Sequence, residues 1–186
     1  NYLFLPSKRE IYQKGINKKI NILQNDKILC AKYRNGHFEG VLAVVNRFME
    51  NIKAKYIFFG EKDFQQIYLI KKYLQKKFSK KIICCRSVRN FNGLPLSSRN
   101  ILLTKKNLKQ SEEISKLLFE FKNKIIKNFI NINQIKLYKS KINRLCDKIE
   151  YFEIRNSKNM TKKINKTNFK IFIAYRQKKI RLIDNI

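Results

Sequence analysis

The sequence predicts an α/β fold with a smaller α+β region after it. Three observations support this fold class: short apolar runs alternate with helical patterns in the first half, two helical patterns follow one another in the second half, and strand patterns close the chain. Alternation of strands and helices is typical of a parallel sheet with crossover helices. The chain has 186 residues, 44% of them hydrophobic, so it is long enough to bury a core.

Strands and helices alternate along the first half. Residues 27–33 have the content of a strand, and apolar residues then recur at intervals of three and four over residues 41–52, which predicts a helix. The predicted buried face of this helix is Val41, Val44, Val45, Phe48, Met49 and Ile52. The apolar run at residues 56–59 ends at a glycine, as a buried parallel strand would. A second helical pattern covers residues 67–78, and residues 81–85 predict another buried strand.

The second half begins with an irregular loop. Residues 89–100 contain a glycine, a proline and several cap-forming residues. Thr104 can cap a long helix whose apolar residues run from 114 to 129, and a further helix is expected over residues 137–145. Strand patterns occupy residues 149–154, 169–173 and 179–183, separated by polar turns.

The chain is strongly basic. Lys and Arg number 43 against 13 Asp and Glu, a formal charge of +30, which raises nucleic acid or an anionic membrane as the first partner to consider. Lysine is spread along the whole chain, however, and it outnumbers arginine, the residue that grips bases and phosphates with two hydrogen bonds. Asn and Ile are also over-used, which fits mutational bias in an AT-rich genome. We therefore expect no dedicated nucleic-acid partner; a basic nucleic-acid-binding protein on an inherited fold is the alternative.

The cysteines and the single histidine limit the metal chemistry. Cys30, Cys84, Cys85 and Cys146 show no C-x-x-C or other paired ligand spacing, and His37 is the only histidine. We expect reduced thiols and no metal site. No apolar run approaches the roughly 18 residues that span a bilayer, and the first residues lack a signal-peptide pattern. The expected location is cytoplasmic, with no membrane partner.

The first candidate site is the turn at residues 59–66, FGEKDFQQ. An apolar strand ends at Gly60, charged residues follow, and a helix begins, which is where ligands bind in open α/β sheets. Gly60 allows a ligand close to the backbone, Lys62 can meet a phosphate, and Asp63 can accept from ribose hydroxyls. A solvated turn with Asp63 as the helix cap is the alternative interpretation.

The second candidate site is the loop at residues 93–100, GLPLSSRN. Ser97 and Ser98 offer two hydroxyls beside the guanidinium of Arg99. Hydroxyls donate single hydrogen bonds and the planar guanidinium grips two oxygens, so this set suits a polyphosphate and the charge that develops in phosphoryl or nucleotidyl transfer. The alternative is a serine-rich helix cap with an exposed arginine.

Taken together, these motifs resemble the pantothenate synthetase family along essentially the whole chain. The matching runs, in the family's order and spacing, are residues 36–45, 59–66, 88–89, 93–100 and 181–186. Pro6, Ser7, Ile11 and Tyr12 also match the family. The combination of Gly-Glu-Lys-Asp with Ser-Ser-Arg-Asn is the most specific part of the resemblance.

The resemblance implies an AMP-forming, ATP-dependent ligase that makes a precursor of coenzyme A. Members of the family activate the carboxylate of pantoate on the α-phosphate of ATP, with Mg, to give an enzyme-bound pantoyl adenylate and pyrophosphate. The amine of β-alanine then displaces AMP and forms the C–N bond of pantothenate. Another adenylate-forming nucleotidyltransferase is a further alternative, against which Gln66 stands at the family's pantoate position.

The resemblance also implies roles for particular residues. The implied catalytic residues are Lys62, Ser97, Ser98 and Arg99. The implied ATP-binding residues are Gly60, Glu61, Lys62, Asp63, Val88, Leu96, Ser97, Ser98 and Arg99. Within this set, Gly60 and Asp63 would contact the ribose and Val88 the adenine through its backbone. Gln66 would bind pantoate, and His37 is expected to be structural.

The implied organisation is a Rossmann-like nucleotidyltransferase domain, N-terminally incomplete, followed by a smaller α+β domain. Residues 1–87 would form the remainder of the ATP- and pantoate-binding domain. Residues 88–186 would form a C-terminal lid domain that closes over ATP. The full-length enzyme is expected to be a homodimer.

Several departures from the family pattern affect the expected activity. Family members carry a His-x-Gly-His motif that holds the ATP phosphates, and this sequence does not contain it. We therefore expect the chain alone to bind ATP weakly and to be inactive; an incomplete record of a longer enzyme, a partner polypeptide and a decaying gene are the open explanations. Smaller departures are Gln13 for Pro, Asn92 for Asp and Pro95 for Ala, of which Pro95 would stiffen the loop.

Overall fold

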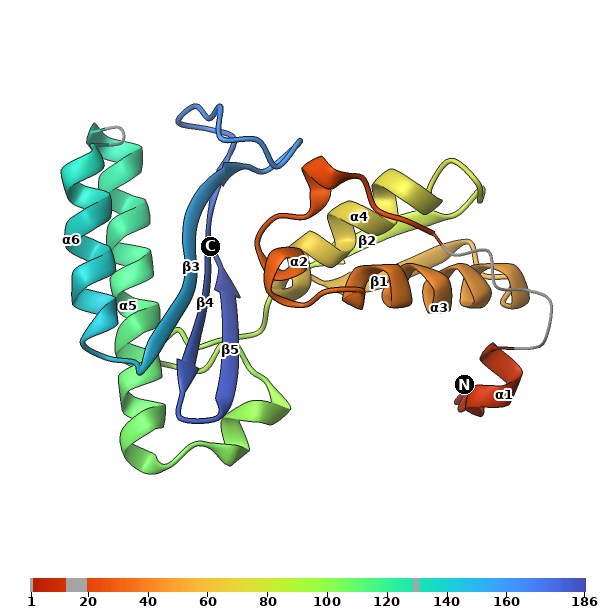
Figure 1. The fold of residues 1–186 in the computed structure, drawn as a ribbon, viewed down its shortest axis with the longest axis horizontal. Helices are drawn as coiled ribbons and strands as arrows, with labels where there is room; N and C mark the ends of the chain where they lie inside the picture. The colour runs from red at the N-terminus through yellow and green to blue at the C-terminus, as the bar shows by residue number, and fades with distance from the viewer. Residues whose placement is uncertain (1, 13–19, 129–130) are drawn as a thin grey trace. The chain divides into compact units, whose positions relative to one another are not determined.

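The computed structural model describes residues 2–12, 20–128 and 131–186. The first elements are α1 (Lys8–Ile11), η1 (Gln24–Asp26), α2 (Cys30–Tyr33), α3 (His37–Asn51), β1 (Tyr56–Gly60), η2 (Glu61–Asp63), α4 (Phe64–Leu74) and β2 (Lys81–Cys85) (Figure 1). The later elements are η3 (Ser98–Leu102), α5 (Lys105–Asn128), α6 (Ile132–Asn143), β3 (Lys148–Asn156), β4 (Phe169–Gln177) and β5 (Ile180–Asn185). Gln13 and the last position of the predicted long helix, residue 129, lie outside the described residues.

The chain divides into two compact units. The first comprises Asn1–Phe59 and Phe64–Cys85, and the second comprises Gly60–Asp63 and Arg86–Ile186. The turn Gly60–Asp63 therefore belongs with the second unit, although it lies in the middle of the first along the chain. The predicted division was into residues 1–87, as the ATP- and pantoate-binding domain, and residues 88–186, as the lid domain. Both domain roles stay predictions.

Two amphipathic helices, α3 and α4, pack against each other in the first unit. The buried apolar side chains are Phe38, Leu42, Val45 and Met49 on α3 and Ile67, Leu69, Ile70 and Leu74 on α4. Both predicted helices are confirmed. The buried face of α3 holds Val45 and Met49 as predicted. Val41, Val44 and Phe48 are only half-buried because Phe38 and Leu42 take the core positions, and Ile52, which follows the last residue of the helix, is exposed.

β1 and β2 are neighbours in a two-stranded sheet, and α4 connects them. A strand–helix–strand connection of this kind joins parallel strands. The predicted strands are confirmed in position, but the prediction that both are buried is wrong. Tyr56 and Phe58 are exposed on β1, and only Ile82 is buried on β2. Burial alternates along β1 because described residues cover one face of the pleated strand more than the other.

The strand predicted over residues 27–33 is also wrong, because these residues include the short helix α2. The side chain of Gln65 on α4 holds this segment: it accepts from the backbone N–H of Cys30 at 3.0 Å and donates to the carbonyl of Ile28 at 2.7 Å. Leu29 has a φ of 47°, which no extended strand contains. A short continuous apolar run fits a strand or a buried helical turn equally well, so periodicity could not separate the two.

An antiparallel sheet of three strands, in the order β3-β4-β5, forms the second unit together with α5 and α6. The two helices lie side by side against one face of this sheet (Figure 1). The core contains Ile114, Leu118, Phe121, Ile125, Tyr138, Ile142, Phe152, Ile171, Ile173, Tyr175 and Leu182. Phe121 stacks on Tyr138 with ring centroids 4.6 Å apart. Both predicted helices and all three predicted strands of this half are confirmed.

The long helix α5 begins directly after Thr104, as predicted. The hydroxyl of Thr104 accepts from the backbone N–H of Asn107 at 3.2 Å, which satisfies one of the N–H groups that a helix leaves unpaired at its start. Ser111 and Ser115 lie fully buried further along the helix, and each hydroxyl donates to the carbonyl four residues earlier. These bonds allow polar residues on the buried face of an otherwise apolar helix.

Two further findings concern only residues 2–12, 20–128 and 131–186. None of their helices combines the length and the apolar composition needed to cross a membrane. Their His, Cys, Asp and Glu side chains form no group of three or more that could hold a metal ion.

Candidate functional site

The turn predicted to bind ATP begins where β1 ends. Gly60 is the last residue of β1, η2 covers Glu61–Asp63, and α4 starts at Phe64. A Cβ added at Gly60 would meet no atom within 4 Å, so packing within the described chain does not require glycine there. The open space beside Gly60 is consistent with close approach of a ligand to the backbone.

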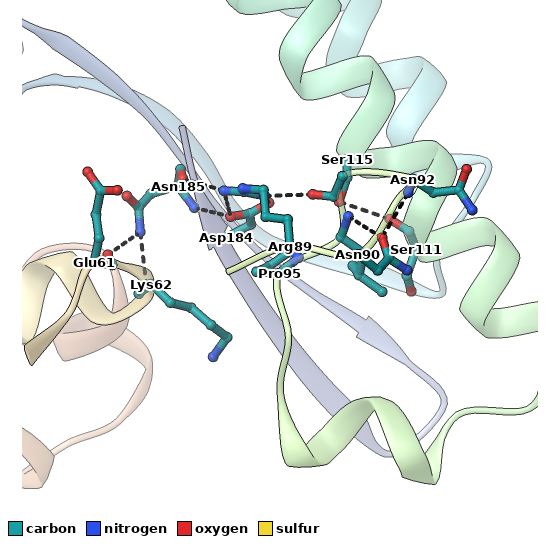
Figure 2. Close-up of polar contacts among 12 residues, drawn as sticks. Glu61, Lys62, Arg89, Asn90, Asn92, Pro95, Ser111, Ser115, Asp184 and Asn185 are labelled. Atoms are coloured by element: carbon teal, nitrogen blue, oxygen red, sulfur yellow. Dashed lines mark hydrogen bonds and ion pairs between the residues drawn. The ribbon is translucent and has the colours of Figure 1, made fainter. Parts of the chain in front are cut away.

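The backbone of this turn is held by Asn185, at the end of β5. The side-chain amide of Asn185 donates to the carbonyls of Glu61 and Lys62, each at 2.9 Å (Figure 2). The Lys62 side chain points away from Asn185 in the same view. The turn is therefore anchored through its main chain, which leaves the lysine side chain available for other contacts.

The carboxylate of Glu61 anchors the same turn to the sheet. It pairs with Lys170 on β4 at 2.8 Å. Burial acts to raise the pKa of Glu61, but the hydrogen bond and charge of Lys170 and a backbone hydrogen bond from Ser87 hold the pKa below its ordinary value. Glu61 is therefore ionised at neutral pH and uses its side chain inside the protein, so its predicted contact with ATP would have to come from its backbone.

A buried ion pair lies on the other side of the β5 end. Arg89 Nη1 and Nη2 donate to the two carboxylate oxygens of Asp184, both at 2.8 Å, and also to the carbonyls of Gly93 and Asn185. The guanidinium stands 5.1 Å from the ring centre of Phe119. Burial raises the pKa of Asp184, while the hydrogen bonds and charge of Arg89 oppose that rise. The two-pronged geometry fixes residues 89–93 against β5.

The loop after Arg89 is organised by two asparagines. The side chain of Asn90 accepts from the backbone N–H groups of Asn92 and Leu94, and both asparagine amides donate to the carboxylate of Glu112 on α5. Gly93 adopts a φ of 85°, which an L side chain would strain. The family resemblance implies an aspartate at position 92, and an aspartate there would place a second carboxylate against Glu112, where Asn92 instead donates a hydrogen bond.

Pro95 fits the loop without loss of a hydrogen bond. The residues on either side of Pro95 make the backbone hydrogen bonds of this loop. The Leu94 carbonyl accepts from the N–H of Asn90, and the N–H of Leu96 donates to the Val88 carbonyl, both at 2.9 Å. The Pro95 carbonyl accepts from the side chain of Asn100 at 3.0 Å. The proline therefore occupies a position where the missing N–H is not needed.

The Ser-Ser-Arg segment lies at the start of η3. Ser97 is its N-cap and accepts from the backbone N–H of Arg99 at 3.3 Å. The structure therefore contains the serine helix cap that the sequence offered as the alternative interpretation of this segment. Ser98 and Arg99 are exposed. Arg99 Nη1 donates to the carbonyl of Arg181 on β5 at 2.9 Å, which orients the guanidinium along this strand.

One hollow in the second unit brings the two predicted motifs together. It is a shallow hollow that is partly open to solvent. Its lining includes Lys62 from the first motif, Ser97, Arg99 and Asn100 from the second, and Arg181 and Asp184 from β5. Arg181 also pairs with the buried carboxylate of Glu150 at 2.7 Å. A hollow with cationic side chains, hydroxyls and amides suits an anionic ligand with several oxygens.

The other predicted residues lie outside this lining. Ser98, Asp63, Val88 and Leu96 are exposed in the second unit and face solvent at least in part. Gln66 is half-buried on α4, in the first unit. His37 opens α3 and stands 5.0 Å from the ring of Phe38. Their predicted roles stay predictions.

Four residues with structural roles at the hollow received none from the sequence: Arg89, Arg181, Asp184 and Asn185. Three of them belong to the closing run RLIDNI, which was part of the resemblance but was given no chemical role. The available signal was the composition of that run, an aspartate and an asparagine at the end of an apolar strand. Such polar residues in a buried strand require partners.

The fold and the hollow together define an α/β protein with a partly open site lined by Lys62, Arg99 and Arg181. The chain belongs to the pantoate–β-alanine ligase family, because the family model described as "Pantoate-beta-alanine ligase" matches residues 1–186. The predicted family is thereby confirmed, and the solved structures described below confirm the predicted fold class.

Curated relatives agree with this assignment. The pantothenate synthetase of Francisella tularensis subsp. mediasiatica (strain FSC147) is 36% identical over 188 residues, covering 98% of this chain and 63% of the relative. The pantothenate synthetase of Francisella philomiragia is 36% identical over 185 residues with the same coverage. The chain thus spans 63% of the length of these curated relatives.

Solved structures show the same fold. Pantothenate synthetase from Thermus thermophilus aligns with a TM-score of 0.86 at 22% identity, over 97% of this chain and 67% of that chain. Pantoate–β-alanine ligase from Francisella tularensis, complexed with beta-gamma ATP and β-alanine, aligns with a TM-score of 0.77 at 34% identity, over 97% of this chain and 62% of that chain.

Proposed function

We propose that the chain contributes the greater part of an AMP-forming ligase that joins pantoate to β-alanine. The observation that carries the proposal is the hollow that unites Lys62 with Ser97 and Arg99, in a chain that belongs to this ligase family. The Francisella tularensis ligase was solved with an ATP compound and β-alanine, which supports the same two substrates here.

The proposed reaction has two steps. A carboxylate oxygen of pantoate attacks the α-phosphorus of ATP, so that a P–O bond forms, the bond to the bridging oxygen breaks, and pyrophosphate leaves. The amine of β-alanine then attacks the acyl carbon of the adenylate and AMP leaves, while the amine loses a proton. Activation is needed because a carboxylate oxygen is a poor leaving group until it carries the adenylyl group.

Lys62, Ser97 and Arg99 would act on the phosphates. Negative charge builds on the departing pyrophosphate in the first step, and cations or hydroxyl donors already in place stabilise it without reorganisation. Ser97 and Arg99 are held by η3 and by β5, and Lys62 by the anchored turn. The proposed catalytic set is Lys62, Ser97, Ser98 and Arg99.

The remaining assignments follow the family match. Gly60 and Asp63 would meet the ribose, Val88 the adenine, and Glu61 and Leu96 would complete the ATP-binding set. Gln66 would bind pantoate. Magnesium would arrive with ATP, because in nucleotide sites it is held largely by phosphate oxygens and water.

We further propose the domain roles expected from the family. Residues 1–87 would form the remainder of the ATP- and pantoate-binding domain, and residues 88–186 the lid. The full-length enzyme would be a homodimer. The chain by itself would be inactive, because it lacks the His-x-Gly-His motif.

The test is AMP release from ATP, pantoate and β-alanine. The assay compares the 186-residue chain with a fusion that adds the part of the Francisella relative that this chain does not span. We expect AMP from the fusion only when all three substrates are present. Lys62→Ala in the fusion should lower the rate by about a hundredfold or more.

The matched control is Lys109→Ala, an exposed lysine on α5 in the same unit, which should leave the rate unchanged. AMP release with another carboxylate but not with pantoate would favour a different adenylate-forming enzyme. No AMP from the fusion under any condition would contradict the proposed function.

A further inference from the structure

The end of β5 connects the two motifs of the proposed ATP site. Asp184 and Asn185 are neighbours, and both are 4% exposed. Side chains of consecutive strand residues point in opposite directions, so the pair can reach two different segments. Asp184 reaches Arg89, ahead of the Ser97–Arg99 loop, and Asn185 reaches the Lys62 turn.

The contact of Asn185 with the turn is specific. Both hydrogens of its amide nitrogen are used, one on the Glu61 carbonyl and one on the Lys62 carbonyl, each at 2.9 Å. Its side-chain oxygen is buried without a hydrogen-bond partner among the described residues. Only a donor fits between two carbonyls, so the amide serves as a bridge across the turn and not as a general packing group.

A second contact restrains the same turn without involving Lys62. Glu61 pairs with Lys170 at 2.8 Å, and Lys170 lies on β4, the strand paired with β5. The turn is thereby held to adjacent strands of one sheet, through the Glu61 side chain and through two backbone carbonyls. The Lys62 side chain takes part in neither contact and lines the hollow instead.

The opposite motif is fixed to the same strand. Arg99 donates to the carbonyl of Arg181 on β5 at 2.9 Å, and the Arg89–Asp184 pair joins the start of the loop to the end of β5. β5 is therefore the common frame on which both cations, Lys62 and Arg99, are placed. Their separation depends on this strand and not on the chain between them.

We propose that Asn185 is a positioning residue for Lys62, and that the β5 end sets the spacing between Lys62 and Arg99 for a polyphosphate. The proposal rests on the proposed function. Its physical reason is that loss of the amide leaves the Glu61 and Lys62 carbonyls without this donor and lets the turn shift. Small misplacements of a catalytic group cost far more than the bonds themselves.

The test combines Asn185→Ala, Lys62→Ala and their double variant in the fusion described under the proposed function, with MgATP binding measured by calorimetry. Each single change should weaken binding by roughly tenfold. The double variant should be little weaker than Lys62→Ala, since a turn without the lysine has nothing left to position. Additive losses would overturn the proposal, because a residue with only a structural role would act independently of Lys62.

The matched control is Asn156→Ala. Asn156 is 7% exposed at the end of β3, and its amide also donates to a backbone carbonyl, that of Lys163, at 3.0 Å. This change should lower stability in the same way as Asn185→Ala, yet it should leave MgATP affinity unaltered. Equal loss of affinity in both variants would contradict the proposal.

Hydrogen exchange gives a readout that does not depend on ATP. Backbone amides of residues 60–63 should exchange at least about tenfold faster in Asn185→Ala than in Asn156→Ala. Unchanged exchange there would overturn the positioning role. If the unaltered chain and the fusion both fail to bind MgATP, the proposed function fails, and exchange alone decides whether Asn185 holds the turn.

Discussion

The two units each use one buried aspartate to hold an irregular segment, but in different ways. In the first unit, Asp26 accepts from Lys72 Nζ at 2.8 and 2.9 Å and from the hydroxyl of Tyr73 at 2.5 Å. The Tyr73 oxygen in turn accepts from the backbone N–H of Leu23 at 2.7 Å. In the second unit, Asp184 receives both prongs of Arg89.

The difference lies in what each aspartate holds. Asp26 ties residues 23–26 to α4, and none of these residues lines the hollow. Asp184 ties the loop of the predicted phosphate-binding residues to β5. Lys72 keeps 36% of its side-chain surface exposed, whereas Arg89 keeps 18%. The more buried, two-pronged pair therefore serves the segment whose geometry matters for the proposed chemistry.

The largest expected effect comes from removal of Arg89. Arg89→Ala leaves the Asp184 carboxylate buried and unpaired, which should cost about 3–5 kcal/mol of unfolding free energy. Urea unfolding followed by circular dichroism measures it, with hydrogen exchange of β4 and α5 to locate the loss in the second unit. The control is Arg86→Ala, an exposed arginine in the same unit. Equal stability of Arg89→Ala and Arg86→Ala would show that the Arg89–Asp184 pair does not stabilise the second unit more than an exposed arginine does.

The two units should also differ in how fast their cysteines react with an alkylating reagent. Burial, with the charge of Asp147, raises the pKa of Cys146 in the second unit to about 11, from an ordinary 9.0. Since the thiolate is the reactive form, iodoacetamide should modify Cys146 about a hundredfold more slowly than an ordinary thiol at pH 7. Cys84 and Cys85 are exposed on β2 of the first unit and should react first. Peptide mapping over time would show this order; similar rates at all three sites would contradict it.

The contacts of Asp26 with Lys72 and Tyr73 should stabilise the protein less than the Arg89–Asp184 pair does. Lys72→Ala removes two hydrogen bonds to Asp26 but leaves that of Tyr73, and solvent can approach from the lysine side. We expect a loss of about 1–2 kcal/mol, below that of Arg89→Ala. The same urea experiment tests the ranking. A larger loss for Lys72→Ala than for Arg89→Ala would reverse it.

The smallest effect concerns Glu50 on α3. Its hydrogen bond with Lys77, helped by Asn46 and Arg47 against weak burial, lowers its pKa from 4.5 to about 2. A lowered acid pKa stabilises the fold fully above pH 4.5, and the contribution disappears as the pH falls through about 2. For this exposed pair we expect Glu50→Gln to cost less than about 1 kcal/mol at neutral pH. Thermal unfolding of both proteins should differ at neutral pH and converge in acid; a difference that persists in acid would show that another cause is responsible.

Much of the fold was predictable because it rests on local periodicity. The patterns that became α3, α4 and α5 repeat every three to four residues, and the three strands of the second unit alternate with polar turns. Residues 27–33 were misread because the deciding contact, the side chain of Gln65, comes from a later helix. The exposure of Tyr56 and Phe58 was missed because an apolar strand reads the same whether one face or both are covered.

The sequence by itself determined the family, the order of most elements and the residue types of the candidate site. Lys62, Ser97 and Arg99 stood out because their chemistry is visible in short motifs. Only the tertiary structure decided that they line one hollow, and that Arg89, Asp184 and Asn185 hold them there. The physical reason is that these side chains meet partners more than 90 residues away, through hydrogen bonds that leave no periodic trace along the chain.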